Sequence, residues 1–344
     1  MTFTIRLADE DREFTCRSDQ SVLDAALEQG IALNYGCKNG LCGSCRGQLL
    51  SGQVDYPGGL PGGINEQETA NGDALFCKAV PQSDLSIRVA LMPHTDDQIV
   101  VKTLPVRVVS VDHLTDDVIR LILQMPAVEE FRFKAGQWIY FVLKDGRKRA
   151  FSIANAPNDR HELELQIRHA VGGVFTDFVF RELKQGALLR IEGPHGNFFL
   201  HEEDRPAILV AGGTGFAPIK GIFEEMIRDG LTRPTHLFWG SRARKDLYQE
   251  DLVKEWVRDH GLKYTPVLSD PTEQDNWQGL TGFVHRAVVD TYPDLSDAAI
   301  YMAGPPQMIE SCKVDFMQAG ASESSLHFDS FDYSSDALDA MKAK

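Results

Sequence analysis

Four cysteines have a spacing that suits metal chemistry. Cys37, Cys42 and Cys45 form a C-x4-C-x2-C run, and Cys77 follows further along the chain. Thiolates are soft ligands that favour iron–sulfur clusters, and this spacing is typical of a four-cysteine [2Fe–2S] site. The run is rich in glycine, which lets a loop wrap a cluster and turn backbone N–H groups toward its sulfurs. We therefore predict that these four residues are metal ligands.

A structural zinc ion is the alternative for the same four cysteines. Zinc sites usually combine two C-x2-C pairs, or cysteine with histidine. This loop has one C-x2-C pair and no histidine, so the pattern favours iron–sulfur. The remaining two cysteines, Cys16 in the strand-like FTCRS and Cys312 in a helix-like stretch, are expected to be buried core thiols.

A glycine-rich turn near residue 212 suits the phosphates of a nucleotide. Strand-like AILVA runs directly into the segment Gly212, Gly213, Thr214, Gly215, Phe216, Ala217, Pro218. Glycines let the backbone approach a ligand, and the start of a helix favours phosphate. Ligands of parallel sheets bind outside the carboxyl ends of the strands, where AGGTG, WGSR and AGPPQM all fall. Taken alone, the turn is a weak signal, because it is not G-x-G-x-x-G.

Two further glycine segments lie in the middle of the chain. Gly172, Gly173 and Thr176, in VGGVFTDFVF, come just before an apolar helical pattern and would offer N–H groups to a pyrophosphate. Gly193 and Gly196, in EGPHGNF, are expected to form a turn. An ordinary turn without a ligand is the alternative for each segment.

The elements around these motifs fall into three blocks, as the length of 344 residues also suggests. Residues 1–91 begin with alternating apolar residues and a short helix, which we expect to be capped by Ser18 or Asp19. Short strands divided by Gly and Pro turns fill residues 102–203 and predict a small antiparallel barrel. Strands alternate with helices in residues 204–335, which predicts a parallel sheet covered by helices. Residues 92–101 are expected to be a linker, and residues 336–344 a C-terminal tail.

Composition excludes several classes of partner. The net charge of −15 argues against nucleic acid, whose binding depends on Lys and Arg that neutralise phosphates. No apolar run approaches the ~18 residues that would indicate a membrane span. The N-terminus alternates like a strand and lacks the order of a signal peptide, so a cytoplasmic location is expected.

The segment RKRAFSIANAP contains Arg149, Phe151 and Ser152, and resembles the R-x-Y-S motif of the ferredoxin–NADP+ reductase superfamily. The resemblance implies that the arginine meets a flavin phosphate and that the aromatic ring packs on the isoalloxazine. It also implies that the serine hydroxyl hydrogen-bonds near the reactive nitrogen of the flavin. Phe151 replaces the usual tyrosine, so stacking is kept and the hydrogen bond of the tyrosine hydroxyl is lost.

Other motifs match the same superfamily in order. The glycines at 172 and 173 with Thr176 resemble its flavin pyrophosphate site, and Gly193 with Pro194 its turn between barrel and next domain. The 212–218 segment matches G-G-T-G-x-A-P, with Pro218 as its last residue. A C-G-P-P-x-M motif is similar to the segment containing Gly304, Pro305 and Met308. Ala303 replaces its cysteine, so any role of that thiol in hydride transfer is absent here.

The nicotinamide cofactor is less clearly specified. Ser241 and Arg242 follow a strand where the superfamily reads the adenosine ribose. Arg242, Arg244 and Lys245 would hold a 2′-phosphate and so favour NADPH, or they form a solvated cluster at a helix start. The resemblance favours NADH, because some NADH-using relatives also carry arginine there. Phe331 is expected against the nicotinamide face of the flavin, and a core aromatic of the last strand is its alternative.

The motifs together cover nearly the whole chain. They resemble three-domain reductases that serve ring-hydroxylating and phenol-type oxygenases, and the CDP-6-deoxy-3,4-glucoseen reductase branch. The resemblance implies a β-grasp plant-type ferredoxin domain, an antiparallel FAD-binding β-barrel and a parallel α/β nucleotide-binding domain. It also implies that electrons pass from NADH through FAD, which exchanges both hydride and single electrons, to [2Fe–2S] and then to a partner oxygenase or dehydrase. We expect a monomer.

Two other functions remain open from the sequence. One is a redox carrier or sensor that uses the iron–sulfur cluster without turning over nicotinamide. The other is a standalone flavin or ferric reductase in which the cluster is an accessory. The first would not need the GGTG and R-x-F-S segments.

Overall fold

A computed structural model divides the chain into two compact units, residues 1–98 and 99–344. It describes residues 1–92, 99–127, 130–201, 203–230 and 232–331. Most of the expected linker 92–101, the last residues of the expected domain 204–335 and the expected tail 336–344 lie outside these residues. No helix in the described ranges is long and apolar enough to cross a bilayer.

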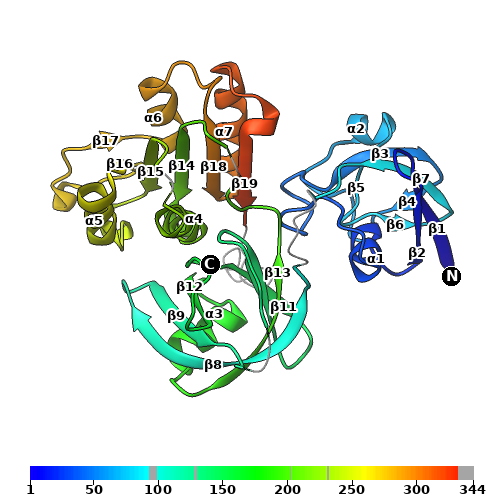
Figure 1. The fold of residues 1–344 in the computed structure, drawn as a ribbon, viewed down its shortest axis with the longest axis horizontal. Helices are drawn as coiled ribbons and strands as arrows, with labels where there is room; N and C mark the ends of the chain where they lie inside the picture. The colour runs from blue at the N-terminus through cyan, green and yellow to red at the C-terminus, as the bar shows by residue number, and fades with distance from the viewer. Residues whose placement is uncertain (93–98, 128–129, 202, 231, 332–344) are drawn as a thin grey trace. The chain divides into compact units, whose positions relative to one another are not determined.

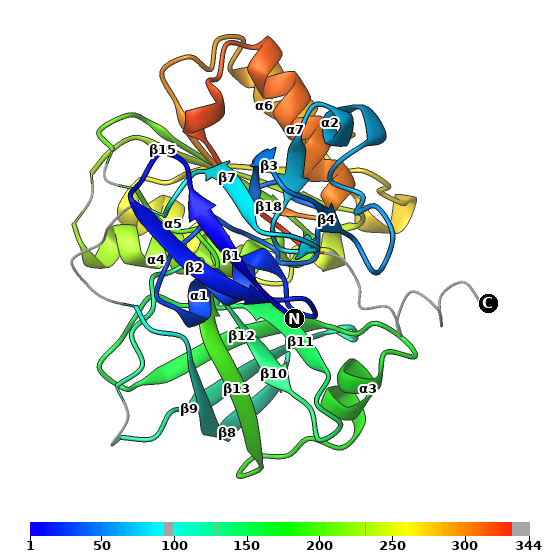
Figure 2. The same ribbon diagram turned by 90° about the vertical axis from the view of Figure 1, so that its right-hand side faces the viewer.

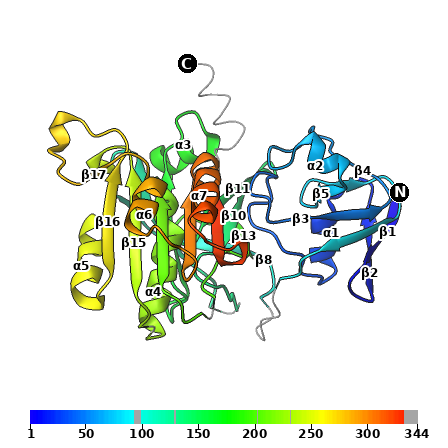
Figure 3. The same cartoon turned by 90° about the horizontal axis from the view of Figure 1, so that it is seen from above.

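The first unit is a mixed sheet beside a short helix (Figure 3). Its strand order is β2-β1-β7-β3-β5, and β1 pairs parallel with β7 and antiparallel with β2. Alternation along β1 buries Ile5 and Leu7, which share the core with Val22 and Leu23 of α1. The elements are β1 (Thr2–Leu7), β2 (Arg12–Arg17), α1 (Val22–Glu28), β3 (Arg46–Ser51), β4 (Val54–Asp55), α2 (Glu66–Ala70), β5 (Asp73–Leu75), β6 (Val80–Pro81) and β7 (Leu85–Val89).

The N-cap of α1 is Ser21, so the prediction of Ser18 or Asp19 is wrong. The Ser21 hydroxyl accepts a hydrogen bond from the N–H of Asp24 at 3.1 Å. Ser18 instead extends the β1–β2 pairing through its N–H, which donates to the carbonyl of Met1. Asp19 pairs with the Arg17 side chain at 3.2 Å.

The second unit begins with a six-stranded antiparallel barrel (Figure 2). Its strand order is β11-β10-β13-β8-β9-β12, and an antiparallel bridge between Ile153 and Leu165 joins the two end strands. Inward-facing apolar residues such as Val106, Leu121 and Ile139 fill the interior. The elements are β8 (Lys102–His113), β9 (Val118–Gln124), β10 (Trp138–Val142), β11 (Lys148–Ser152), β12 (Glu162–Arg168), α3 (Val174–Arg181) and β13 (Leu188–His195).

Two local predictions in the barrel are wrong. Gly193 and Pro194 lie inside β13 and not in a turn; only Gly196, with φ of +86°, turns the chain after the strand. Gly193 is required by packing, because a Cβ there would lie 2.8 Å from Cγ2 of Ile139. Thr176 lies in the first turn of α3 rather than before it, since the helix begins at Val174 with Gly173 as N-cap.

The rest of the second unit is a parallel sheet with helices on both faces (Figure 1). Helices α4 and α5 pack with one apolar cluster and α6 and α7 with the other. The elements are β14 (Ala207–Gly212), α4 (Phe216–Arg228), β15 (Thr235–Ser241), α5 (Glu250–His260), β16 (Lys263–Leu268), β17 (Leu280–Thr281), α6 (Val284–Thr291), β18 (Ala299–Gly304), α7 (Pro306–Gln318) and β19 (Leu326–Ser330).

The strand order of this sheet places a ligand crevice between β14 and β18. The order is β17-β16-β15-β14-β18-β19, so successive connections run one way from β14 and the other way from β18. Parallel sheets bind ligands at such a reversal, outside the carboxyl ends of the strands. Gly212 ends β14 and Gly304 ends β18, so both predicted glycine motifs border this crevice.

Candidate functional site

The four predicted metal ligands come together in the first unit as two pairs of thiols. The Cys37 thiol hydrogen-bonds that of Cys42, and the Cys77 thiol hydrogen-bonds that of Cys45. The backbone N–H of Cys37 donates to the Cys42 sulfur, and that of Cys42 to the Cys37 sulfur, both at 3.4 Å. Cys42, Cys45 and Cys77 are buried, and Cys37 is half-buried.

Pairing prepares one thiol of each pair for deprotonation. The hydrogen bond from Cys37 lowers the pKa of Cys42, and the one from Cys77 lowers the pKa of Cys45. The same hydrogen bonds raise the pKa of Cys37 and of Cys77. Because thiolates are the metal-binding form, each pair has a ready first ligand.

This arrangement fits a two-iron cluster. No group of three or more His, Cys, Asp or Glu side chains in the described ranges is placed to surround a single metal ion. Two pairs of thiols match two irons that each take two protein sulfurs, whereas a tetrahedral zinc needs all four thiols around one point. Gly36 keeps the backbone close, since a Cβ there would lie 3.2 Å from the Cys42 sulfur.

A second loop fixes the cysteine loop from outside. Gly40 has φ of +84°, and a Cβ on it would lie 2.8 Å from Cβ of Pro61. The N–H of Gly63 donates to the carbonyl of Gly40 at 2.9 Å. Arg46 binds the Gly63 carbonyl at 2.9 Å and forms a 2.5 Å ion pair with Glu68. The metal-binding loop is therefore held by backbone and side-chain contacts that do not use the thiols.

In the barrel, strand β11 separates the predicted flavin residues onto two faces. Arg149 and Phe151 alternate onto one face, and the Phe151 ring lies 5.5 Å from the Phe175 ring of α3. No side chain caps the N-terminus of α3, where Gly173 is the N-cap. A half-buried aromatic ring, an arginine and a helix N-terminus suit the ring and phosphates of a flavin dinucleotide.

Thr176 holds the loop before α3. Its hydroxyl donates to the carbonyl of Ala170 at 2.8 Å and accepts the Ala170 N–H at 3.3 Å. Gly172, exposed with φ of +88°, completes this loop. The His169 ring lies 2.7 Å from the Asp177 carboxylate, and this hydrogen bond lowers the pKa of Asp177.

Ser152, on the other face of β11, reaches the parallel-sheet domain. Its hydroxyl donates to Oδ2 of Asp329 in β19 at 2.8 Å, and Asp329 is only 4% exposed. Phe331 follows two residues later, half-buried, with its N–H donating to the carbonyl of Gly304. Sequence reasoning missed Asp329; an acidic residue alternating with the apolar residues of the last strand was the only signal.

The glycine motifs of β14 and β18 form one surface without room for Cβ atoms. A Cβ on Gly215 would overlap the carbonyl oxygen of Ala303, and one on Gly212 would overlap the sulfur of Met308. A Cβ on Gly304 would lie 2.8 Å from Cε of Met308. Met308 thus covers both turns, a role that the sequence did not predict.

Aromatic packing supports this surface from behind. The Trp239 ring stacks on Phe216 at 3.9 Å, and its Nε1–H donates to the carbonyl of Gly213 at 3.0 Å. Thr214 lies in the short 3-10 turn between β14 and α4, and Pro218 is buried in the first turns of α4. Pro305 is the N-cap of α7, exposed at the crevice.

The expected ribose-binding residues differ in exposure. Ser241 is 8% exposed, and its hydroxyl lies 3.5 Å from the carbonyl of Asp246. Arg244 is engaged with Asp275, through its N–H to Oδ1 at 3.0 Å and its guanidinium to the carbonyl at 3.4 Å. Arg242 is exposed at the end of β15, and within the described ranges its side chain has no hydrogen bond or ion pair.

Family models match all three parts of the chain. A 2Fe-2S iron–sulfur cluster binding domain matches residues 5–82, an oxidoreductase FAD-binding domain residues 105–200, and an oxidoreductase NAD-binding domain residues 209–314. These segments contain the cysteine pairs, the β11 site and the glycine crevice, respectively.

Similar proteins share the whole length of the chain. The CDP-6-deoxy-L-threo-D-glycero-4-hexulose-3-dehydrase reductase of Yersinia pestis is 37% identical over 96% of this chain and 99% of its own. The phenol hydroxylase P5 protein of Acinetobacter pittii is 34% identical over 96% and 95%. The crystal structure of a cytochrome P450 reductase from Amycolatopsis superposes with a TM-score of 0.80, at 31% identity, over 96% of this chain and 98% of that one.

Proposed function

This chain belongs to the reductase family that joins a 2Fe-2S ferredoxin domain to FAD-binding and NAD-binding oxidoreductase domains, and we propose that it supplies electrons from NADH to a terminal oxygenase or a dehydrase. The observation that carries this proposal is full-length similarity to reductases named for both kinds of acceptor. The family accounts for electron transfer, and the choice of acceptor is the part that needs testing.

Nicotinamide and flavin supply hydride chemistry when bound, and the iron–sulfur cluster supplies one-electron chemistry. The residues of the chain bind and orient these groups. Cys37, Cys42, Cys45 and Cys77 hold the cluster through their two thiol pairs. Met308 packs on Gly212 and Gly304, whereas a Cβ on Gly213 would meet nothing within 4 Å, so Gly213 leaves space that would admit a dinucleotide to the crevice. No side chain of the chain needs to act as nucleophile or general base for this reaction.

On the flavin side, Arg149 and the N-terminus of α3 would hold the phosphates, and Phe151 would pack on the ring system. The Ser152 hydroxyl is fixed by its hydrogen bond to Asp329 and would lie where hydride passes from nicotinamide to flavin. The Asp329 carboxylate accepts the hydrogen bond from the Ser152 hydroxyl, so the oxygen lone pairs of Ser152 stay directed away from Asp329. Phe331 follows β19, lies beside Gly304 and packs against the apolar cluster of α4 and α5; from there it would cover the nicotinamide side of the flavin.

NADH is the preferred nicotinamide in this proposal. Arg242, Arg244 and Lys245 are all exposed after β15, and Arg244 is engaged with Asp275. Exposed cations give weak recognition of a 2′-phosphate, because exposed ion pairs contribute little. We also expect the protein to act as a monomer, which size-exclusion chromatography would test.

Cofactor analysis and acceptor assays test the proposal together. Acid extraction and chromatography should give FAD and about two irons per chain, as one [2Fe–2S] centre requires. NADH oxidation should speed up when an oxygenase or dehydrase partner is added. FMN, about four irons per chain, or a rate indifferent to every partner would contradict the proposal; the last result would indicate a standalone flavin reductase.

A further inference from the structure

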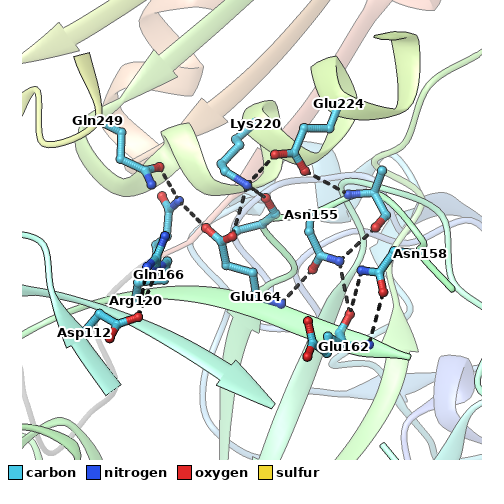
Figure 4. Close-up of polar contacts among 12 residues, drawn as sticks. Asp112, Arg120, Asn155, Asn158, Glu162, Glu164, Gln166, Lys220, Glu224 and Gln249 are labelled. Atoms are coloured by element: carbon cyan, nitrogen blue, oxygen red, sulfur yellow. Dashed lines mark hydrogen bonds and ion pairs between the residues drawn. The ribbon is translucent and has the colours of Figure 1, made fainter. Parts of the chain in front are cut away.

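Strand β12 of the barrel carries a row of polar side chains that bind the parallel-sheet domain (Figure 4). Glu164, Gln166 and Arg168 alternate onto one face of this strand. Gln166 accepts a hydrogen bond from the Tyr248 hydroxyl at 2.7 Å and donates to Gln249 at 2.8 Å. Arg168 pairs with Asp117 at 2.6 Å and lies 3.6 Å from Asp246.

The buried cation that this row binds is Lys220 of α4. Its side chain is 5% exposed, and its Nζ binds the Glu164 carboxylate at 3.1 Å. Nζ also donates to the Ala154 carbonyl at 3.0 Å and to Oε1 of Glu224 at 2.6 Å. These three acceptors match the three N–H donors of an ammonium group, so the buried charge is both paired and fully hydrogen-bonded.

The same contacts tie the irregular segment after Ser152, residues 154–156, to α4. Oε2 of Glu224 accepts the N–H of Ala156 at 3.3 Å. A Cβ on Gly221 would lie 3.2 Å from the carbonyl oxygen of Asn155, so α4 approaches this segment closely. The N–H of Ala154 donates to the Glu164 carbonyl, beside the bridge that closes the barrel. The Nζ atom of Lys220 therefore connects helix α4 to the segment beside the bridge that closes the barrel.

The two elements that Lys220 connects, α4 and residues 154–156, each adjoin one half of the candidate site: the dinucleotide turn and Ser152. Helix α4 begins directly after the turn Gly213–Gly215 of the dinucleotide crevice. The segment that Lys220 holds through Ala154 follows Ser152 by two residues. Lys220 therefore lies a few residues after the turn along α4, and its hydrogen bond to Ala154 brings it a few residues from Ser152.

We propose that Lys220 is a positioning residue, which sets the distance between the dinucleotide turn and the Ser152 strand and so the alignment for hydride transfer. The proposal rests on the function proposed above, because it presumes hydride transfer in this crevice. Lys220 contacts neither cofactor; it acts through α4 and through residues 154–156. Misplacement of reacting groups by about 1 Å can slow a reaction ~100-fold.

The first test is Lys220→Met in the holoenzyme, followed by rapid mixing with NADH. The rate constant of flavin reduction at saturating NADH should fall ~10- to 100-fold, while the Kd of NADH changes less than ~3-fold. Hydrogen exchange of the resting protein, before NADH is added, should show faster exchange of the amides at 154–156. A wild-type reduction rate, or a loss confined to the Kd, would refute the positioning role.

Lys254→Met is the matched control. Lys254 pairs with Glu250 at 2.7 Å, four residues apart on a helix of the same domain, as Lys220 does with Glu224. Its side chain is 55% exposed, so its loss should change the reduction rate less than ~2-fold. Slow flavin reduction by NADH in the wild-type protein, by contrast, would count against the proposed function and not against the positioning role of Lys220.

A double variant separates positioning from stability. Lys220→Met alone leaves the Glu164 carboxylate, 13% exposed, without its cation and lowers the thermal midpoint. Lys220→Met/Glu164→Gln removes that uncompensated charge, so the midpoint should recover. Flavin reduction should stay slow, because the bond between α4 and the barrel is still missing. Recovery of the rate together with the midpoint would show that Lys220 is only structural. If the single variant folds poorly, the flavin-reduction rate of the double variant decides between a positioning and a structural role.

Discussion

The cysteine site of the first unit and the crevice of the second are built in opposite ways. Three of the four thiols come from one nine-residue run, and the loop around them is fixed by its own unit. Beside the crevice, Ser152 and Asp329 are 177 residues apart and come from different domains. The cysteine site is therefore specified by local sequence. The contact of Ser152 with Asp329 exists only through the packing of the barrel on the parallel sheet, so the geometry on this side of the crevice is sensitive to residues that touch no ligand.

The largest expected effect comes from breaking the local site. Cys42→Ser replaces a buried thiol, whose pKa is lowered by Cys37, with a harder and less acidic donor. The protein should lose its cluster and, with it, most cytochrome c reduction and all partner turnover. NADH-dependent ferricyanide reduction should continue, because the second unit has its own cores.

Buried cysteines outside the cluster provide the control for this loss. Cys312→Ser changes a thiol of α7 that is buried in the core and belongs to neither pair. It should lower stability without changing the iron content. A cluster-free Cys42→Ser protein that still drives its partner at the wild-type rate would show that electrons leave from the flavin.

Sequence reasoning predicted the fold class correctly, because residue type and local spacing carry that signal. The cysteine run, the glycine turns at β14 and β18, and the alternation of strands and helices predicted the fold class. It failed where packing decides the role of a residue. Gly193 is typical of a turn but lies in β13, and glycine is required there because Ile139 leaves no space for a side chain. Asp329 could not be found from sequence, since its partner Ser152 is known only from the packing.

The crevice itself should be disrupted most by one added methyl group. Gly215 has ordinary helical φ and ψ, so alanine there is not strained, yet its Cβ would overlap the Ala303 carbonyl. The turn must move away from β18, and kcat/KM for NADH should fall ~100-fold in steady-state assays. Gly58→Ala, where a Cβ meets nothing within 4 Å, should leave it unchanged. An unaffected Gly215→Ala enzyme would place the dinucleotide elsewhere.

A smaller effect is expected from one of the hydrogen bonds that link the barrel to the parallel-sheet domain. Ser152→Ala removes the hydroxyl that donates to Asp329, and flavin reduction should slow ~10- to 50-fold, the lower part of the range for a hydrogen bond to a charged group. Every downstream activity should slow with it, while the iron content stays constant. Ser110→Ala removes a similar hydroxyl–carboxylate bond, to Asp112 at 3.0 Å, far from β11 in sequence and should be silent. Equal effects of the two variants on flavin reduction would show that Ser152 is not part of the site.

The smallest effect tests the edge of the crevice, where packing gives way to solvent. Arg242 is exposed, and an exposed contact to a 2′-phosphate is worth ~1 kcal/mol or less. Arg242→Ala should therefore lower kcat/KM for NADPH ~3- to 5-fold and change that for NADH by less than ~1.5-fold. Arg244→Ala is the comparison, because Arg244 is engaged with Asp275 and its loss should affect both nicotinamides alike. A wild-type kcat/KM at least ~10-fold higher for NADPH, a difference of ~1.4 kcal/mol, would reverse the proposed preference. Such a preference would mean that the bound 2′-phosphate orders the exposed side chains at this edge, whereas packing orders the buried part of the crevice.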